Sequence, residues 1–573
     1  MAPGTTVAQL LLARAGDERP GLLFENERYS WRRVVVESRR RAAVARALRH
    51  PGPFHVGVLL DNVPEYLFWI GGAALAGAVV VGINPTRQGE ELAGDIRHTD
   101  CQLLVTERRH LPLIAGLDLG LPAERTVVVD GPVDGRYRRL LRRARRSGGG
   151  AEEASGADPD DTLLLLFTSG SSGAPKAVVC SQGRLATIAS TAAERFGITA
   201  QDVLYEAMPL FHGNAIMANW APALASGATV ALRRRFSASG FLPDVRRFRA
   251  TYFNYVGRAL TYVLTTSASP QDRDNRLRLG FGTEASARDR EDFERRFGCP
   301  LVENYGSSEG VVTILRQPGT PPDALGLPPP GPGVDVAVVE PRTGEECPRA
   351  RFDGHGRLVN GDGAIGEIVN RGGAGAFEGY YKNEEANRAR LRDGWYWTGD
   401  LAYRDEDGWF YFAGRSSDWL RVDGENFASA PIERILSRLP GVVNAAVFPV
   451  PDVRTGDQVM AALELDGRWE RGRDLFPTDL EAFLASQPDL GTKWAPRFVR
   501  VVGAMPLTGT NKVDRQLLRR SAWGGRDPVY WRRDEGSAYE RMTPADIEQL
   551  GREFDAHGRR AFNPDFSRRG PHT

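Results

Sequence analysis

The chain has 573 residues, of which 74 are basic and 73 acidic, and its formal net charge is +1. This length favours two domains over one, and the balance of charge excludes the large basic field that nucleic acids attract. The bases are nearly all arginine, because lysine occurs only at Lys176, Lys382, Lys493 and Lys512. The four cysteines lack C-x-x-C spacing, which predicts buried, reduced thiols and neither a zinc site nor a disulfide framework.

The N-terminal segment lacks a basic region before its short apolar run, so it predicts a first helix and no signal peptide. Further on, residues 66–83 form an uncharged stretch of membrane-spanning length. Its first half is rich in small residues that suit helix packing, and its second half is a β-branched run that ends at Asn84-Pro85. A buried helix followed by a buried strand is therefore predicted, without a membrane span.

Short apolar runs alternate with helix-length segments from roughly residue 20 to residue 415. The strand-like runs include 55–60, 78–83, 101–106, 125–130 and 162–168. Such alternation is typical of α/β proteins with largely parallel sheets. Residues 131–160 are charged and Gly-rich and predict an exposed connection, and the Pro/Gly-rich residues 319–333 predict a loop.

A shorter α/β unit is expected after Arg415. Its pattern predicts helices near 431–438 and 477–486 and strands near 443–450 and 457–465. Beyond residue 528 the chain is highly charged, as in a C-terminal tail or a peripheral helix. We therefore predict a large α/β domain of parallel-sheet subdomains at 1–416, a small α+β domain at 417–527 and a charged C-terminal extension at 528–573.

A loop rich in glycine and hydroxyl residues directly follows the apolar strand-like run at 162–168. It consists of Thr168, Ser169, Gly170, Ser171, Ser172, Gly173, Ala174, Pro175 and Lys176. Glycines let backbone N–H groups approach a polyphosphate, hydroxyls donate further hydrogen bonds, and Lys176 adds a compact positive charge. The loop departs from the pattern G-x-x-x-x-G-K-[ST], but its place after a strand favours phosphate binding over a plain turn.

With this loop, four downstream segments carry a family resemblance: MPLFHGNAIM, FSASGFLPDVRRFRATYFNYVG, the motif Tyr305-Gly306-Ser307-Ser308-Glu309, and YFAGRSSDWLRVDGENFASAPIERIL. Over roughly residues 5–525 the chain resembles the superfamily of acyl-CoA synthetases, non-ribosomal peptide synthetase adenylation domains and firefly luciferase. It is most similar to actinobacterial fatty-acid–CoA ligases of the very-long-chain and fatty-acid-transport-protein group. The resemblance implies an N-terminal adenylation domain and a mobile C-terminal domain that rotates about a hinge at Asp418.

The resemblance also implies where ATP and Mg²⁺ bind. Tyr305 is expected to stack on adenine, Ser307 and Ser308 to lie by the α-phosphate, and Glu309 to help hold Mg²⁺. The positions that match the adenine edge are Gly282, Thr283 and Glu284. Asp400 is expected to bind the ribose hydroxyls, and Arg415 to reach ribose or phosphate.

Three further positions match residues that act on the acyl group. Lys512 matches the catalytic lysine that bridges the acid and the α-phosphate, with Asn511 where relatives often have glycine. Gly424 belongs to a loop that approaches the pantetheine tunnel, and His212 matches a position beside the acyl pocket. Residues 252–264 resemble a helix that could line that pocket, although an ordinary core helix would look the same.

Phosphate binding, Mg²⁺, ribose recognition and a mobile lysine all appear in family order, which favours an enzyme over a non-catalytic binding protein. The resemblance implies ATP-dependent activation of a fatty or other hydrophobic acid to acyl-AMP, with pyrophosphate release, and then transfer to coenzyme A (CoA). Two alternatives stay open: a fatty acyl-AMP ligase that serves a carrier protein, and a diazotase that activates nitrite for an aryl amine. The expected partners are small molecules in the cytoplasm; the acid's chain length and the oligomeric state stay open.

Overall fold

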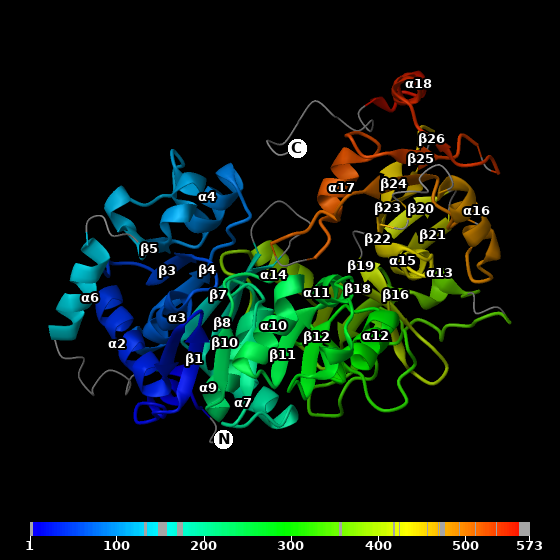
Figure 1. Cartoon of the computed structure of the whole chain (residues 1–573). Helices are drawn as coiled ribbons and strands as arrows, with labels where there is room; N and C mark the ends of the chain where they lie inside the picture. Colours follow the sequence, from blue (N-terminus) through cyan, green and yellow to red (C-terminus); the bar gives the residue numbers. More distant parts are fainter. Residues whose placement is uncertain are drawn as a thin grey trace. The chain divides into compact units, whose positions relative to one another are not determined.

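The computed structural model describes residues 4–130, 135–146, 157–168, 176–354, 358–415, 419–422, 425–454, 456–467, 469, 476–491, 493–509, 512–534 and 536–560. The chain divides into two compact units (Figure 1). Unit 1 comprises Met1–Thr313 and Ala374–Leu391, and unit 2 comprises Ile314–Gly373 and Arg392–Thr573.

Unit 1 contains two largely parallel sheets, as the alternating pattern predicts. In the first sheet, hydrogen-bonded neighbours follow the order β13 (Leu301–Tyr305), β12 (Leu279–Thr283), β11 (Tyr252–Val256), β9 (Val203–Glu206), β10 (Thr229–Leu232), β1 (Pro20–Phe24) and β2 (Glu27–Ser30). The second follows the order β6 (Thr126–Val128), β5 (Cys101–Thr106), β3 (His55–Leu59), β4 (Val79–Gly82), β7 (Thr162–Thr168) and β8 (Lys176–Ser181). Only the β1–β2 and β7–β8 pairs are antiparallel in these two sets.

Most helices of unit 1 lie between these strands in the sequence, while α1 precedes them and α14 follows them. The helices are α1 (Val7–Leu12), α2 (Trp31–Ala47), α3 (Pro64–Ala76), α4 (Gly89–His98), α5 (Leu111–Ile114), α6 (Arg136–Arg146), α7 (Gln182–Arg195), α8 (Gly213–Ala215), the π-helical turn η4 (Ile216–Trp220), α9 (Ala221–Ser226), α10 (Ala238–Phe248), α11 (Gly257–Leu264), α12 (Ala287–Phe297) and α14 (Glu384–Arg390). The first helix predicted at the N-terminus is thus present as α1.

The uncharged stretch at 66–83 lies in α3 and β4, so the prediction of a buried helix and a buried strand is confirmed. Small residues let α3 pack closely against α2. A Cβ atom at Gly71 would lie 2.3 Å from Ser38 Oγ, and one at Gly72 would lie 2.6 Å from Arg41 Cβ. Within the described ranges, no helix is both long and apolar enough to cross a membrane.

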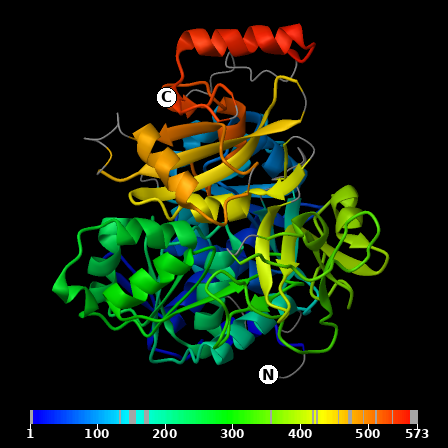
Figure 2. The ribbon, with the colours of Figure 1, turned by 90° about the vertical axis from the view of Figure 1, so that its right-hand side faces the viewer.

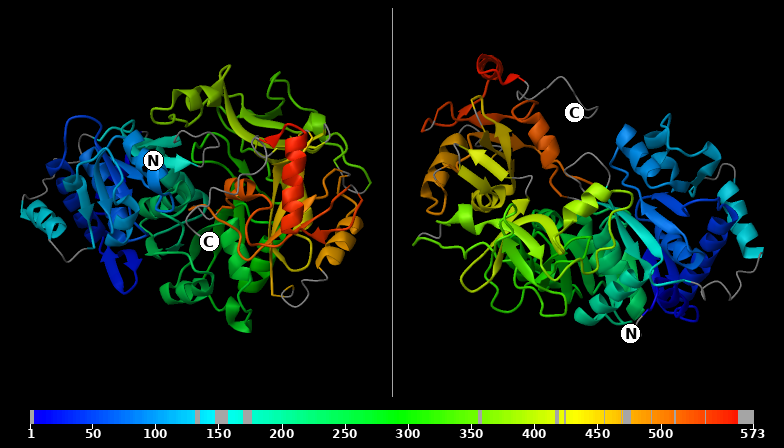
Figure 3. Two further views of the ribbon diagram at one scale, coloured as in Figure 1. Left: turned by 90° about the horizontal axis from the view of Figure 1, so that it is seen from above. Right: turned by 180° about the vertical axis from the view of Figure 1, so that it is seen from behind.

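Two predictions for unit 1 are wrong. Part of the connection expected at 131–160 is the helix α6, which packs beside α2 (Figures 1 and 3). Tyr137 anchors α6 because its ring is buried and its hydroxyl donates a hydrogen bond to Glu65. The helix expected at 252–264 is a strand, β11, followed by α11, since the β-branched and aromatic residues of its first half join the central sheet.

Unit 2 contains an antiparallel sheet in the order β15 (Val336–Val339), β16 (Gly366–Asn370), β18 (Trp395–Arg404) and β19 (Phe410–Arg415). Unit 2 also contains β14 (Ile314–Leu315), α13 (Gly361–Ala364), the hairpin β20 (Trp419–Val422) and β21 (Glu425–Ala428), and α15 (Ser429–Leu436). Residues 319–333 form no helix or extended strand, which agrees with the predicted loop.

A second sheet of unit 2 follows the order β22 (Val442–Pro451), β23 (Asp457–Leu465), β24 (Phe498–Val502), β25 (Val529–Trp531) and β26 (Glu540–Arg541). Its helices are α16 (Phe476–Ser486), α17 (Arg515–Ser521) and α18 (Pro544–Ala556). The helices and strands predicted between 431 and 486 thus lie within two residues of their observed bounds. This mixed α/β architecture is the one expected for the small domain.

The charged extension beyond residue 528 contributes to this second sheet. Two of its strands, β25 and β26, extend the sheet beyond β24. Its helix α18, red in Figure 2, buries Leu550 and Phe554 in a cluster with Trp523 and Phe498. Burial of these apolar side chains stabilises the extension against the small sheet.

All four cysteines are buried free thiols, as predicted. Burial raises the pKa of Cys101, Cys180 and Cys299 to about 12 and that of Cys347 to about 11. These thiols therefore remain protonated at neutral pH and are poor nucleophiles.

Candidate active site

The predicted site residues of unit 1 follow the carboxyl ends of neighbouring parallel strands. His212 follows β9, Glu284 follows β12, and Gly306 follows β13. Because β9, β11, β12 and β13 are parallel, the segments after them gather at one edge of the sheet. Ligands of open α/β sheets bind at this carboxyl edge.

The hairpin of β7 and β8 frames the predicted phosphate loop. Thr168 is the last residue of β7, Lys176 is the first residue of β8, and the two are paired directly across the hairpin. Both are partly exposed. Five predicted phosphate-binding residues lie outside the described residues: Ser169, Gly170, Ser171, Ser172 and Gly173.

Gly213 brings the two sheets of unit 1 together at the site. A Cβ atom there would lie 3.2 Å from Ser308 Oγ and 3.7 Å from Leu166 Cδ1 in β7. Immediately before it, His212 caps α8, since its Nδ1 accepts a hydrogen bond from the Asn214 backbone N–H at 3.3 Å. The half-buried His212 therefore lies one residue from a close contact with the Tyr305–Glu309 motif.

The Tyr305–Glu309 motif is held by a buried arginine. Tyr305 ends β13 and is partly exposed, whereas Gly306 and Ser307 are exposed. Arg184, on α7, donates to the Ser308 carbonyl at 2.6 Å and to the Val179 carbonyl at 2.9 Å. This arginine ties the turn at Ser308 to β8, the strand that begins at Lys176.

The Glu309 carboxylate is suited to hold a divalent cation. It is buried, and its Oε1 accepts a hydrogen bond from the Tyr380 hydroxyl at 2.6 Å. The Tyr380 hydroxyl in turn accepts from Arg390 Nε at 3.0 Å, which orients it. No described residue bonds to Glu309 Oε2, so one oxygen of a hard ligand stays available for Mg²⁺.

The turn after β12, which contains Gly282, Thr283 and Glu284, is fixed by Glu303. This buried carboxylate accepts from the Ala285 backbone N–H at 2.8 Å and from the Tyr255 hydroxyl at 3.2 Å. Burial raises the pKa of Glu303, and its ion pair with Arg290 opposes that shift.

Gly282 is required by packing, because a Cβ atom there would lie 2.4 Å from the Tyr255 ring. Two residues later, Glu284 is exposed and has a φ of +70°. Only glycine fits at the start of α11, since a Cβ atom at Gly257 would lie 2.1 Å from the Glu284 carbonyl oxygen.

In unit 2, the predicted ribose-binding residues are directly paired across two strands. Asp400 in β18 lies opposite Arg415 in β19. The Asp400 backbone N–H donates to Thr398 Oγ1 at 3.1 Å, and Thr398 Oγ1 donates to the Ile368 carbonyl at 2.7 Å. These two hydrogen bonds hold the backbone of the turn at Asp400, the residue that pairs with Arg415 in the sheet register.

Lys512 lies at the end of a short loop before α17. The Thr508 backbone N–H donates to the Lys512 carbonyl at 2.7 Å, and Lys512 N donates back to Thr508 Oγ1 at 3.3 Å. The lysine is half-buried. Asn511, the hinge residue Asp418 and Gly424 lie outside the part of the chain that the structure describes.

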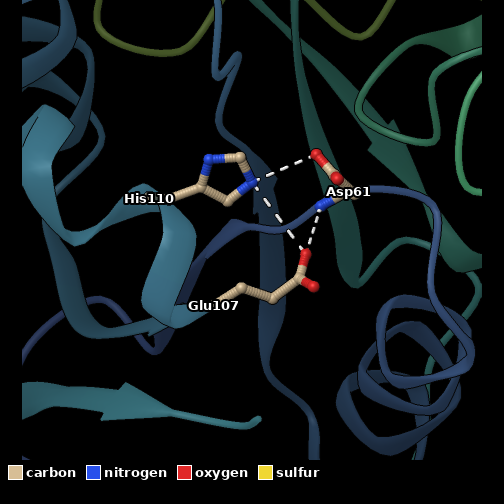
Figure 4. Close-up of side chains that lie close together, drawn as sticks. All are labelled: Asp61, Glu107 and His110. Carbon is tan, nitrogen blue, oxygen red and sulfur yellow. Dashed lines mark hydrogen bonds and ion pairs between the residues drawn. The ribbon is translucent and has the colours of Figure 1, made fainter. Parts of the chain in front are cut away.

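Asp61, Glu107 and His110 form a buried cluster of metal-ligating residue types (Figure 4). His110 Nε2 lies 3.1 Å from Asp61 Oδ1, and the Asp61 backbone N–H donates to Glu107 Oε2 at 2.8 Å. The remaining carboxylate oxygens are occupied by arginines: Arg109 at 2.7 Å and Arg235 at 3.4 Å from Asp61, and Arg234 at 2.6 Å from Glu107. Two arginines at Asp61 Oδ2 and one at Glu107 Oε1 disfavour a cation there, so we interpret the cluster as an ion-pair network.

A cavity of about 890 Å³ lies within unit 2. Its lining includes Arg349, Asn360, Glu406, Phe427 and Trp494. None of the predicted site residues lines it, so it has no part in the candidate site.

Sequence reasoning did not identify Arg184, Glu303 or Tyr380. Arg184 lies 124 positions from Ser308 and Tyr380 lies 71 positions from Glu309, whereas Glu303 lies 18 positions from Ala285 and two residues before Tyr305. A buried charged residue next to a motif would be the useful signal, but burial of Arg184 and Glu303 depends on the tertiary fold.

Two family models match the chain. The model "AMP-binding enzyme" matches residues 12–381, and "AMP-binding enzyme C-terminal domain" matches residues 431–512. A steroid-22-oyl-CoA synthetase of Rhodococcus jostii (strain RHA1) is 53% identical over 97% of this chain and 99% of its own. A medium/long-chain fatty-acid–CoA ligase of Mycobacterium tuberculosis is 44% identical over 92% of this chain and 98% of its own.

Solved structures show the same fold. A benzoate CoA ligase from Burkholderia xenovorans LB400 aligns with a TM-score of 0.76 at 21% identity, over 90% of this chain and all of that one. An o-succinylbenzoate coenzyme A synthetase from Bacillus subtilis, in complex with ATP and magnesium ion, aligns with a TM-score of 0.68 at 25% identity, over 89% and 98%. The chain belongs to the AMP-binding enzyme family and is an ATP-dependent, AMP-forming acid–CoA ligase.

Proposed function

We propose that the acid activated by this ligase is a steroid with a carboxylated side chain. The single observation that carries this assignment is the 53% identity to the steroid-22-oyl-CoA synthetase over nearly both whole chains. That match covers 97% of this chain, so it reaches into the charged extension beyond residue 528. A medium- or long-chain fatty acid is the second candidate, supported by the 44% identity to the mycobacterial ligase.

The acid is assigned to the region beside His212 and Gly213. A Cβ atom at Gly213 would lie 3.2 Å from Ser308 Oγ, and Ser308 belongs to the motif that ends in Glu309, the residue proposed to bind the cation. A carboxylate there lies close to the position proposed for the α-phosphate.

The nucleotide is assigned to the carboxyl edge of unit 1. The phosphates lie at the β7–β8 hairpin between Thr168 and Lys176, and adenine lies between Tyr305 and the turn at 282–284. In unit 2, Asp400 and Arg415 bind the ribose and its phosphate. Bound to Glu309, Mg²⁺ would neutralise phosphate charge.

In the first half-reaction one oxygen of the acid attacks the α-phosphorus. The new O–P bond forms as the bond to pyrophosphate breaks, and pyrophosphate leaves with the electron pair. Lys512 stabilises the negative charge that accumulates between the acid and the α-phosphate. In the second half-reaction the CoA thiol loses its proton and its sulfur attacks the acyl carbonyl carbon. AMP then leaves with the electron pair of the acyl–oxygen bond.

A cytoplasmic location is part of the proposal, because ATP and CoA are both available there. Fractionation of the source cells, followed by detection of the chain in the cytoplasmic and membrane fractions, tests this point.

A competition assay tests the substrate. The full-length protein is given ATP, Mg²⁺ and CoA with an equimolar mixture of a steroid-22-oic acid and dodecanoic acid. Mass spectrometry then compares the two CoA thioesters at early times. We expect the steroid thioester to form at least about tenfold faster, since a factor of ten corresponds to only about 1.4 kcal/mol of transition-state binding. A product mixture dominated by dodecanoyl-CoA would contradict the assignment.

A further inference from the structure

A chain of three asparagine amides runs from the centre of the first sheet to the candidate site. Asn219 Nδ2, in η4, donates to the Tyr205 carbonyl at 2.9 Å and to Asn254 Oδ1 at 2.8 Å. Asn254 Nδ2, in β11, then donates to Asn214 Oδ1 at 2.8 Å. Asn214 lies in α8, two residues after His212.

The orientation of every amide in this chain follows from its first contact. A backbone carbonyl can only accept, so the Asn219 atom facing Tyr205 must be the nitrogen. It follows that Asn254 accepts through Oδ1 and donates through Nδ2, and that Asn214 accepts through Oδ1. The Nδ2 group of Asn214 therefore lies at the free end of the chain, with no bond to any described residue.

The exposed fractions of the three asparagines show which end of the chain a ligand can reach. Asn219 is 0% exposed and Asn254 is 3% exposed, whereas Asn214 is half-buried. The accessible end thus carries two N–H donors and no acceptor. Asn214 follows Gly213, where a Cβ atom would lie 3.2 Å from Ser308 Oγ, so Asn214 is one residue away from a close approach to the Tyr305–Glu309 motif.

Burying the polar groups at the inner end of this chain of amides costs free energy of folding. Glu206 is fully buried at the end of β9, and burial raises its pKa well above the usual range, while contacts with the Met208 N–H and with Asn254 oppose the shift. Glu206 Oε2 and Asn219 Oδ1 are buried without a hydrogen-bond partner among the described residues. Apolar side chains of similar volume would avoid this cost, so the polar chain calls for a reason beyond stability.

We propose that Asn214 Nδ2 binds the carboxylate oxygen of the acid substrate that does not attack ATP, and that Asn254 and Asn219 orient this amide. The proposal rests on the placement of the acid beside His212 and Gly213. This substrate oxygen stays unbonded to phosphorus and becomes the acyl carbonyl oxygen of the adenylate. It therefore needs only hydrogen-bond donors in both half-reactions, and the Asn214 amide nitrogen supplies them. Asn214 is then a substrate-contacting residue, and Asn254 and Asn219 are positioning residues.

The test compares Asn214→Asp with Asn214→Ala in the full-length protein. The aspartate side chain keeps the oxygen that accepts from Asn254, so the buried chain stays intact while the outward donor becomes a charged acceptor. We expect kcat/KM for the acid to fall about 10- to 100-fold in Asn214→Ala and further in Asn214→Asp, with KM for ATP unchanged. Acids to be used are a steroid-22-oic acid and dodecanoic acid, and the assay is acid-dependent pyrophosphate release.

Asn254→Ala, which removes the orienting contact and leaves Asn214 in place, is expected to raise KM for the acid by a smaller factor. Asn444→Ala is a matched control, because Asn444 is a buried amide bonded to Glu464 at 2.5 Å in unit 2. It should lower the melting temperature without selectively raising KM for the acid.

The inference is wrong if Asn214→Asp retains wild-type kcat/KM for the acid, or if KM for ATP rises as much as KM for the acid. The latter outcome would assign Asn214 to the phosphates. These results differ from failure of the proposed function, in which the wild-type protein itself would form no thioester from the steroid acid.

Discussion

Replacing Tyr380 with phenylalanine removes one hydroxyl group from a buried contact with Glu309. This hydroxyl donates to Glu309 Oε1 at 2.6 Å and accepts from Arg390 Nε at 3.0 Å. Tyr380 is 3% exposed and Glu309 is 5% exposed, so water has little access to replace the lost donor. Hydrogen bonds to charged groups contribute about 1.5–3 kcal/mol, and we expect the free energy of unfolding to fall by about 2 kcal/mol.

The same substitution should alter the dependence on Mg²⁺ and ATP. Without the tyrosine, the Glu309 carboxylate loses the contact that fixes its orientation toward the cation. We expect KM for Mg-ATP to rise about tenfold, which corresponds to about 1.4 kcal/mol of lost binding. Acid-dependent pyrophosphate release measured over a matrix of Mg²⁺ and ATP concentrations gives this value, and thermal unfolding gives the stability change.

Tyr381→Phe is the matched control, because the neighbouring hydroxyl donates to Asp100 Oδ2 at 2.7 Å, away from the motif. This variant loses a similar phenol–carboxylate contact and should keep the wild-type dependence on Mg²⁺. The reasoning is refuted if both variants raise KM for Mg-ATP equally, or if Tyr380→Phe leaves KM unchanged.

Three other substitutions probe separate parts of the structure. Burial raises the pKa of Asp95 to about 7, so the folded state keeps a proton that the unfolded chain releases near pH 4. Its contribution to stability should fall as pH rises from about 4 to 7, and Asp95→Asn should flatten that part of the plot of melting temperature against pH; an unchanged slope would contradict this. Gly282→Ala places a Cβ atom 2.4 Å from the Tyr255 ring and should lower the free energy of unfolding by about 1–3 kcal/mol, measured by denaturant titration. A change below about 0.5 kcal/mol would show that the Tyr255 ring moves aside without strain. Lys512→Ala should abolish acid-dependent pyrophosphate release and leave ATP binding, measured by calorimetry, largely intact; full adenylation by this variant would remove Lys512 from the mechanism.

The sequence predicted those features that depend on local pattern. Apolar runs located β3, β4, β5 and β7, and small residues before a β-branched run separated α3 from β4 within one uncharged stretch. The family resemblance assigned His212 and the Tyr305–Glu309 motif to one site. A Cβ atom at Gly213 would lie 3.2 Å from Ser308 Oγ, and the roles of these residues stay predictions.

Prediction from sequence was wrong where a tertiary partner decides the structure. The segment 136–146 is extremely basic, yet it forms α6 because Tyr137 is buried and bonded to Glu65. Residues 252–256 form a strand because β9 and β12 flank them in the sheet. The helix-like pattern of residues 252–264 did not show that a strand ends and a helix begins within this segment.

The residues that hold the site were equally hidden. Tyr380 lies 71 positions from Glu309, and Arg184 lies 124 positions from Ser308. Asn214, Asn219 and Asn254 are isolated amides in the sequence, and only the fold joins them into one chain of hydrogen bonds. A local sequence pattern shows neither which distant residues come into contact nor whether their hydrogen bonds are buried, and burial is what strengthens them.

The most direct measurement is identification of the products by mass spectrometry with and without CoA. The purified full-length protein is incubated with ATP, Mg²⁺ and a steroid-22-oic acid, and CoA is then added. We predict accumulation of the steroid acyl-AMP and pyrophosphate before CoA, followed by conversion of the adenylate to the steroid acyl-CoA and AMP. Formation of ADP in place of AMP, or absence of a thioester with the steroid acid and with fatty acids, would contradict the account.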